Sequence, residues 1–181
     1  MKRFTLVLAA SLTIMLFIGP AACEKKGPYA DDKKGPTTAA GEINWSGYDD
    51  GMKKAQAAGK PVMIDFYTTW CKWCKTLDET TYKDKDVINI LNNDFVAIKV
   101  NAESTNKVNY DGKQITEAEL ARAFQVSGFP TIWLLDNTGK KIAPLPGYNP
   151  PEEFKPVLTF VSSGAYAKGV KYDEYLKTLK K

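Results

Sequence analysis

Runs of apolar residues alternate with helical and polar stretches along most of this chain. Val62–Tyr67 and Phe95–Val100 are short and almost continuously apolar, a pattern typical of strands buried on both faces of a sheet. Pro130–Leu135 is a third such run, and the turn sequence Asp136–Gly139 leads from it into a fourth strand at Lys141–Ala143. The pattern therefore predicts four strands, the last two forming a hairpin.

Helical signals lie between these strands. Ser46 is predicted to cap a first helix, which ends at Gly59. Thr116 and Glu119 have the spacing of a capping box and predict the start of another helix. Further helices are expected to begin near Cys71, at Asp84 or Asp86, and at the sequence Pro150–Glu153.

The order of these elements predicts an α/β fold in which helices flank a mixed central sheet. The polar segment Asn101–Ile115 is expected to form an exposed loop or a small hairpin. Near the end of the chain, Tyr172, Tyr175, Leu176 and Leu179 recur at helical spacing and predict an extra C-terminal helix. We expect this helix to pack on the domain; a docking face for a partner is the alternative.

Residues 1–22 have the pattern of an export signal. Lys2 and Arg3 precede the apolar run Phe4–Ile18, which is short for a membrane-spanning helix. Small residues then lead into Cys23, an arrangement that resembles the site at which bacterial lipoproteins are cleaved and lipidated, although Pro20 departs from that pattern. Simple cleavage that leaves a free thiol is the alternative. Either route places the mature protein outside the cytoplasm, where disulfides persist.

Residues 23–41 are predicted to form a flexible tether. The sequence Lys-Lys-Gly-Pro occurs twice, at Lys25–Pro28 and Lys33–Pro36, without an apolar period that would build a core. About 18 such residues span roughly 25 Å, enough to hold a domain away from a membrane surface. We therefore expect a folded domain over residues 42–163 and a helical extension over residues 164–181.

Composition excludes several classes of chemistry. The 181 residues are 44% hydrophobic and 25% charged, and 25 basic and 21 acidic residues give a formal net charge of +4. These proportions are typical of a folded globular protein and give little reason to expect nucleic-acid binding. The chain has no histidine, which excludes an imidazole base and every zinc site with histidine ligands.

Two of the three cysteines, Cys71 and Cys74, are separated by two residues where a buried strand gives way to a helix. The start of a helix offers free N–H groups and a partial positive charge, which favour a thiolate at Cys71. Lys72 and Lys75 add cations that act in the same direction. Because the thiolate is the nucleophile in disulfide exchange, Cys71 is expected to be exposed and to attack, and a more buried Cys74 to resolve.

A Cys-x-x-Cys pair also occurs in zinc sites and in structural disulfides. A zinc site needs four ligands, and Cys23, on the predicted tether, is the only other cysteine. A structural disulfide is the second alternative, but a two-residue gap closes too small a loop to stabilise the fold strongly. We expect neither a metal nor an organic cofactor, because the Cys71–Cys74 dithiol itself carries two electrons.

The segment from Val62 to Cys74 closely resembles the active-site strand and helix start of proteins with the thioredoxin fold. Gly128–Thr131 resembles the cis-proline loop of that family, and Gly147 matches a later family glycine. The resemblance covers residues 42–161 and is specific, because separate motifs occur in the same order. It implies a thioredoxin fold with an extra C-terminal helix.

Within that family, Thr80–Tyr82 and the helix after Asp86 look most like the C-terminal domain of transmembrane thiol:disulfide interchange reductases of the DsbD type. Small exported thioredoxin-like proteins related to it are also similar. Cytosolic thioredoxin is less similar, because Lys72 and Trp73 replace its Gly-Pro pair and the polar loop after Asn101 is longer.

The resemblance also implies roles for single residues. Asp65 matches a buried carboxyl group whose pKa is raised by burial and which would accept the proton of the resolving cysteine. Lys99 matches a lysine that pairs with this carboxylate, although a surface lysine is the alternative. Pro130 matches the cis-proline, which would set the backbone of Phe129 beside the disulfide to pair with an extended substrate. The residues expected to contact substrate are Trp70, Lys72, Trp73, Phe129 and Pro130. For Trp70, partial burial in the core is the alternative.

Together these features predict an extracytoplasmic thiol–disulfide oxidoreductase that acts on exported proteins and contacts a membrane through a lipidated Cys23. The Asp65–Lys99 pair and the family resemblance favour reduction of client disulfides with electrons from a membrane donor. The cations of Lys72 and Lys75 favour the opposite direction, because they stabilise the reduced thiolate. The alternatives are a thiol oxidase or isomerase, a thioredoxin of cytochrome c maturation, and a redox-inert peptide-binding module.

Overall fold

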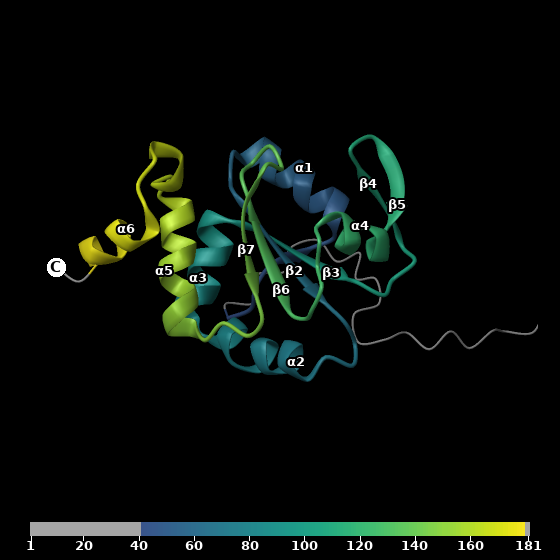
Figure 1. Ribbon diagram of the computed structural model, residues 1–181, viewed down its shortest axis with the longest axis horizontal. Coiled ribbons are helices and arrows are strands. Elements are labelled where there is room, and N and C mark those ends of the chain that lie inside the picture. Colours follow the sequence, from purple (N-terminus) through teal and green to yellow (C-terminus); the bar gives the residue numbers. More distant parts are fainter. Residues whose placement is uncertain (1–40, 180–181) are drawn as a thin grey trace, which may run out of the picture. The chain divides into compact units, whose positions relative to one another are not determined.

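The computed structural model describes residues 41–179, which form a five-stranded sheet, a separate two-stranded hairpin and the helices around them (Figure 1). The strands are β1 (Trp45–Ser46), β2 (Val62–Tyr67), β3 (Val96–Asn101), β4 (Lys107–Tyr110), β5 (Lys113–Thr116), β6 (Thr131–Leu135) and β7 (Lys141–Pro146). The α-helices are α1 (Tyr48–Ala58), α2 (Lys72–Glu79), α3 (Lys85–Asp94), α4 (Glu117–Ala123), α5 (Pro151–Ser162) and α6 (Tyr172–Leu179). Two short 3-10 helices are η1 (Thr81–Lys83) and η2 (Tyr166–Lys168). The predicted α/β class and the four predicted strands are confirmed.

The main sheet is mixed and has the strand order β1-β3-β2-β6-β7. The central strand β2 is parallel to β3 on one side and antiparallel to β6 on the other. Strand β7 extends the sheet beyond β6 as the predicted hairpin. The register places Asp65 of β2 opposite Lys99 of β3, so the two residues expected to pair lie on adjacent strands.

Side chains on the two faces of this sheet belong to separate hydrophobic clusters. Met63 and Leu134 pack with side chains of α2, α3 and α5 on one face. Ile64 and Phe66 pack with side chains of α1 and α4 on the other. Because neighbouring residues of β2 enter opposite clusters, every side chain of this strand is buried, as its continuous apolar run predicts.

Helix α1 lies very close to strand β3, and a glycine makes this approach possible. A Cβ atom at Gly51 would collide with Cγ1 of Ile98. The helix ends at Gly59, which has a φ of +66° in the left-handed region, as predicted for a C-terminal glycine.

The predicted start of α1 was wrong. Ser46 belongs to the two-residue strand β1, and its Oγ accepts a hydrogen bond from Lys54 Nζ. The N-cap residue is Gly47, which has no side chain to bind the free N–H groups of the first turn. A strand of two residues has no hydrophobic period, so β1 was not predicted.

Two other helices, α3 and α4, begin at the residues that were predicted to cap them. Asp84 caps α3 by accepting hydrogen bonds from the backbone N–H groups of Asp86 and Val87. Thr116 and Glu119 form the predicted capping box at the start of α4. These helices therefore begin where local hydrogen bonding, rather than packing, determines the boundary.

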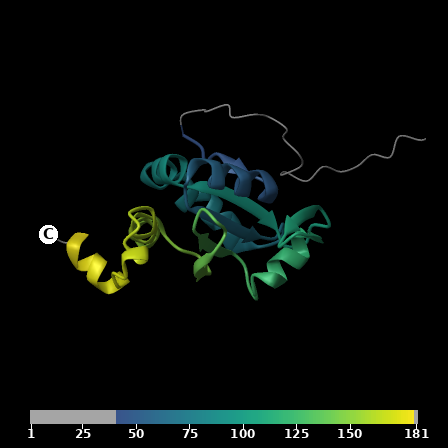
Figure 2. The ribbon, with the colours of Figure 1, turned by 90° about the horizontal axis from the view of Figure 1, so that it is seen from above.

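The hairpin β4–β5 and helix α4 lie at one end of the sheet, and α6 lies at the other (Figures 1 and 2). The predicted C-terminal helix packs on the domain, because Phe160 of α5 contacts the rings of Tyr172 and Tyr175 at 5.3 and 5.2 Å between centroids. Within residues 41–179, every helix is too short or too polar to cross a bilayer.

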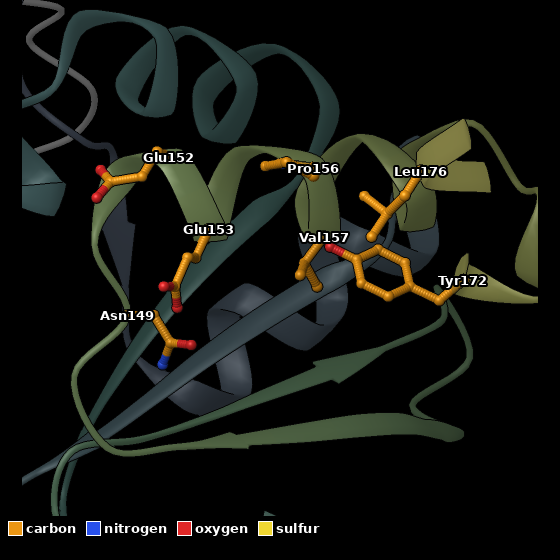
Figure 3. Close-up of a pocket in the computed structure, with 7 residues that line it drawn as sticks. All are labelled: Asn149, Glu152, Glu153, Pro156, Val157, Tyr172 and Leu176. Atoms are coloured by element: carbon orange, nitrogen blue, oxygen red, sulfur yellow. The ribbon is translucent and has the colours of Figure 1, made fainter. Parts of the chain in front are cut away.

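A surface pocket of about 390 Å³ lies between α5 and α6 (Figure 3). Tyr172 and Leu176 of α6 face Val157 of α5 across it, and two carboxylates of the first turn of α5 lie at its other end. The lining residues are Asn149, Glu152, Glu153, Pro156, Val157, Tyr172 and Leu176. The pocket therefore contains none of the residues that the sequence identifies as a candidate site.

Candidate active site

Cys71 and Cys74 form a disulfide at the N-terminus of α2, with Cα atoms 5.3 Å apart. Strand β2 ends at Tyr67, and the chain then turns so that the N–H of Cys71 donates to the carbonyl of Thr68. Cys71 is the N-cap residue, and its sulfur accepts a hydrogen bond of 3.0 Å from the N–H of Cys74. Free N–H groups at a helix start stabilise negative charge, so this position favours a thiolate on Cys71 after reduction.

The expected difference in exposure between the two cysteines was wrong. Cys71 and Cys74 are both 4% exposed. They form a small hydrophobic cluster with Tyr67, against which Phe129 packs, and these aromatic contacts bury Cys71 as well as Cys74. This cluster is separate from the two clusters that fill the faces of the sheet, so the disulfide lies outside the main core.

Asp65 is fully buried on β2, as predicted. Its Oδ2 lies 3.6 Å from Nζ of Lys99, and its Oδ1 is buried without a hydrogen-bond partner among residues 41–179. Burial raises the pKa of Asp65 from 3.8 to about 6, while the positive charge of Lys99 acts against this rise. A carboxyl group with this pKa is able to take up and release a proton near neutral pH.

Asp78 of α2 belongs to the same group of charges, and it was not predicted from the sequence. Nζ of Lys99 donates a hydrogen bond to Oδ1 of Asp78, which is closer to it than Asp65 is. The negative charge of Asp78 also raises the pKa of Asp65. The only signal in the sequence is a carboxylate four residues after Cys74, one helical turn away.

The side chain of Lys99 is only 8% exposed, so the alternative of a surface lysine was wrong. Three aromatic rings surround its ammonium group, with centroids at 4.9 Å for Trp45, 5.2 Å for Tyr67 and 5.5 Å for Tyr82. The faces of these rings attract the cation and partly replace its lost hydration. Burial, together with the charges of the two carboxylates, raises the pKa of Tyr82 well above its ordinary value, so this phenol stays protonated.

The peptide bond between Phe129 and Pro130 is cis, as the resemblance implies. Oγ1 of Thr131 donates to the carbonyl of Gly128 at 2.7 Å. The N–H of Gly147 donates to the carbonyl of Pro130 at 2.8 Å. These hydrogen bonds tie the cis-proline loop to the start of β6 and to the loop that follows β7.

Exposed aromatic rings lie on either side of the first cysteine in the sequence. Trp70 is 67% exposed and Trp73 is 57% exposed, so partial burial of Trp70 in the core was wrong. The ring of Trp70 meets Phe129 edge-on at 6.1 Å, and its Nε1 donates to Oε1 of Glu103. The ring of Trp73 lies 5.8 Å from that of Tyr148. Tyr148 was not predicted from the sequence, because nothing local links it to a cysteine so far away in the chain.

The remaining candidates are Lys72, Lys75 and Cys23, and within residues 41–179 no ion pair joins either lysine to the groups described above. Lys72 and Lys75 are exposed on α2. Cys23 lies outside the described residues, so its lipidation stays a prediction. Between residues 41 and 179, no cluster of three or more His, Cys, Asp or Glu side chains has the arrangement of a metal site.

Comparison with known proteins identifies the family. The sequence profile of the thioredoxin-like domain matches residues 48–162. Among curated proteins, the thiol:disulfide interchange protein DsbD of Salmonella typhi is 37% identical over 87 residues. This match covers 48% of the present chain and 14% of DsbD, so the chain corresponds to a small part of that protein.

Solved structures show the same relationship. A thioredoxin-fold protein from Helicobacter pylori is 30% identical, with a TM-score of 0.57, over 68% of this chain and 81% of that one. A thioredoxin from Thermus thermophilus is 27% identical, with a TM-score of 0.58, over 71% and 93% of the two chains. The sheet, the Cys-x-x-Cys disulfide and these similarities agree: the chain belongs to the thioredoxin-like family and has the thioredoxin fold.

Proposed function

We propose that this protein is an extracytoplasmic thiol–disulfide oxidoreductase that reduces disulfides in exported proteins. One observation carries the proposal. The Cys71–Cys74 disulfide lies at a helix N-terminus, within a fold that also buries an acid, Asp65, with a pKa of about 6. The similarity to a thiol:disulfide interchange protein supports the same class of reaction.

Reduction of a client takes two exchange steps. The thiolate of Cys71 attacks one sulfur of the client disulfide, a Cys71–client bond forms, and the other client sulfur leaves as a thiolate. Cys74 then attacks the sulfur of Cys71, which restores the Cys71–Cys74 disulfide and releases the second client thiol. Two electrons pass from the dithiol to the client, so the balance requires no organic cofactor or metal.

The second step needs a proton acceptor, because the attacking form of Cys74 is the thiolate. Asp65 is the proposed acceptor, since its raised pKa lets it hold a proton near neutral pH. Lys99 is a positioning residue that keeps a positive charge beside Asp65, at 3.6 Å from its Oδ2.

The proposed substrate contacts surround the cis-proline loop. The backbone of Phe129 and Pro130 would pair with an extended client segment. The side chains of Trp70, Lys72 and Trp73 would contact its flanks. The packing of Phe129 against the disulfide cluster supports this placement.

The location outside the cytoplasm rests on the sequence of residues 1–41. We propose that residues 1–22 are an export signal, that Cys23 carries a lipid, and that residues 23–41 tether the domain to a membrane. An exported reductase does not meet cytosolic reductants, so a membrane protein is the proposed electron donor.

Cysteine variants test the proposal in an insulin-reduction assay with dithiothreitol as electron source. The wild-type protein is expected to accelerate insulin reduction, and Cys71→Ser to abolish the acceleration. Cys74→Ser is expected to accumulate a mixed disulfide at Cys71, because the resolving sulfur is missing. Cys23→Ser, the matched control, is expected to retain the wild-type rate. Full activity of Cys71→Ser would refute the mechanism, and an inactive wild type would favour a redox-inert binding module.

A further inference from the structure

Exposed apolar surface is concentrated beside the disulfide. In the described part of the chain, the exposed large hydrophobic side chains are Trp70, Trp73 and Leu179. Trp70 immediately precedes Cys71 and Trp73 lies between the two cysteines, whereas Leu179 lies on α6 at the far end of the fold (Figure 1). A tryptophan exposed to water beside a reactive group is a candidate for contact with a partner.

Trp73 is held on one side by an ordered neighbour. Its ring lies 5.8 Å from that of Tyr148, with 31° between the ring planes. The hydroxyl of Tyr148 lies 3.0 Å from Oγ1 of Thr80. Because Oγ1 of Thr80 donates its own proton to the carbonyl of Thr76, the tyrosine is the donor in this pair.

The loop that carries Tyr148 is fixed at both ends. The N–H of Gly147 donates to the carbonyl of Pro130, and Oγ1 of Thr81 donates to the carbonyl of Asn149. The loop is therefore tied to the cis-proline on one side and to η1, directly after α2, on the other. A rigid aromatic surface of this kind loses little conformational entropy when a ligand stacks on it. We call the paired rings of Trp73 and Tyr148 the aromatic platform.

Two exposed cations lie next to Trp73 on α2. Lys72 and Lys75 are exposed on either side of Trp73 in the sequence of α2. Neither lysine makes an ion pair with another of the described residues. A carboxylate on a bound segment would therefore find unpaired cations beside the exposed indole.

We propose that the aromatic platform is a specificity site for client segments that carry an aromatic residue and an acidic residue close to the reacting cysteine. The proposal rests on the proposed thiol–disulfide function and adds the class of client. The aromatic side chain stacks on the exposed face of Trp73, and the acidic side chain pairs with Lys72 or Lys75. Tyr148 acts as a positioning residue that orients the indole.

Short cysteine peptides joined by a disulfide to thionitrobenzoate test this directly. Attack by the Cys71 thiolate on the peptide sulfur forms a Cys71–peptide disulfide and releases the coloured thionitrobenzoate anion. Cys74 then displaces the peptide thiol and restores the intramolecular disulfide. Three peptides of equal length are compared: one with Phe and Asp beside the cysteine, one with Ala and Asp, and one with Phe and Lys. Each rate is divided by the rate with 5,5′-dithiobis(2-nitrobenzoate), which has no flanking residues.

The wild-type protein is expected to prefer the Phe-Asp peptide over the Ala-Asp peptide by about fivefold, the size of one aromatic pair. Trp73→Ala and Tyr148→Ala are expected to reduce this ratio to about one. Leu179→Ala, which removes the exposed apolar side chain far from the platform, is expected to keep it. The preference for Phe-Asp over Phe-Lys is expected to fall as salt is raised and to be lost in Lys72→Ala/Lys75→Ala.

Each other outcome overturns a defined part of the inference. Equal rates for all three peptides, with thionitrobenzoate still released, would refute the specificity site and leave the proposed function intact. Absence of release from every substrate would refute both. A second copy of the chain is the competing occupant of the platform. A wild-type dimer in sedimentation that Trp73→Ala dissociates would assign the platform to that copy and refute the proposal.

Discussion

Asp65 gives the folded protein a pH dependence of its own. Burial raises its pKa from 3.8 to about 6, against the attraction of Lys99 and with a contribution from Asp78. The phenol of Tyr82 also faces this carboxylate and stays protonated. The folded state therefore binds more protons than the unfolded state between about pH 4 and pH 6, so this residue lowers stability as pH rises through that window.

Asp65→Asn is predicted to stabilise the oxidised protein at pH 7, because the amide removes a buried charge. The gain over wild type should be small at pH 4, grow towards pH 6 and then stay constant, at a size on the order of 3 kcal/mol. Urea unfolding from pH 4 to pH 8 measures it. If the difference in unfolding free energy between Asp65→Asn and the wild type did not change with pH, the raised pKa of Asp65 would be contradicted.

Asp84→Asn is a control, because it is expected to lower the stability that Asp65→Asn raises. Hydrogen bonds from the N–H of Val87 and of Asp86, with the charge of Lys155, lower the pKa of Asp84 despite some desolvation. Its charged form therefore stabilises the fold above its unfolded pKa, and this contribution is lost as pH falls. The cost of Asp84→Asn should accordingly shrink in acid, where the gain from Asp65→Asn also disappears.

Asp78→Asn is predicted to lower the pKa of Asp65. The substitution removes a negative charge that raises this pKa, and it removes the acceptor that holds the Lys99 ammonium. The pH midpoint of the Cys74 resolution step, followed by single-turnover release of a client thiol, should shift to lower pH. Glu79→Gln changes an exposed carboxylate one residue away and should leave the midpoint in place. Equal midpoints in the wild type and Asp78→Asn would refute this role.

Residue-level prediction from the sequence succeeded where the neighbours in the chain determine the environment. Asp65 lies within a continuous apolar run, so its burial could be predicted, and Cys71 follows a strand end, so its place at a helix start could be predicted too. Tyr148 and Asp78 acquire their roles through contacts across the fold. The equal burial of the two cysteines likewise depends on Phe129, which reaches them from another loop.

At the scale of elements, substitutions of two glycines, Gly51 within α1 and Gly47 at its N-cap, are expected to change stability in opposite directions. Gly51→Ala should destabilise the protein by about 1–3 kcal/mol, because the added methyl group collides with Ile98, although alanine is normally the better helix residue. Gly47→Ser should stabilise it by a few tenths of a kcal/mol, because a hydroxyl at the open N-cap position can bind a free N–H group. Thermal unfolding of both variants checks this. A stable Gly51→Ala would mean that α1 does not contact β3 as described.

Elements with strong local signals could be predicted, and elements without them could not. The capping box at Thr116 and the aspartate cap at Asp84 fixed two helix starts from a few residues. Ser46 is also a residue type that caps helices, but its backbone pairs with β3 as part of strand β1. A serine that could cap a helix thus becomes a strand residue, because tertiary pairing outweighs local propensity.

At the scale of the whole molecule, the direction of electron flow depends on opposing charges. The N–H groups at the start of α2 and the cations of Lys72 and Lys75 stabilise the reduced thiolate, which favours an oxidant. The proposed reductive direction rests on the Asp65–Lys99 pair, in which Nζ of Lys99 lies 3.6 Å from Oδ2 of Asp65. The protein acts as a reductase only if the Asp65–Lys99 pair affects the reduction potential more than the helix N–H groups, Lys72 and Lys75 do.

An equilibrium titration of the Cys71–Cys74 couple tests that claim most directly. The purified protein is equilibrated with glutathione and dithiothreitol buffers of defined potential, and the fraction of free thiols is measured by alkylation and mass spectrometry. We predict a two-electron transition at about −270 mV, the range of thioredoxin-type reductants. A transition at about −120 mV, typical of a strong thiol oxidant, would contradict the proposed reductase, and so would a disulfide that no buffer reduces.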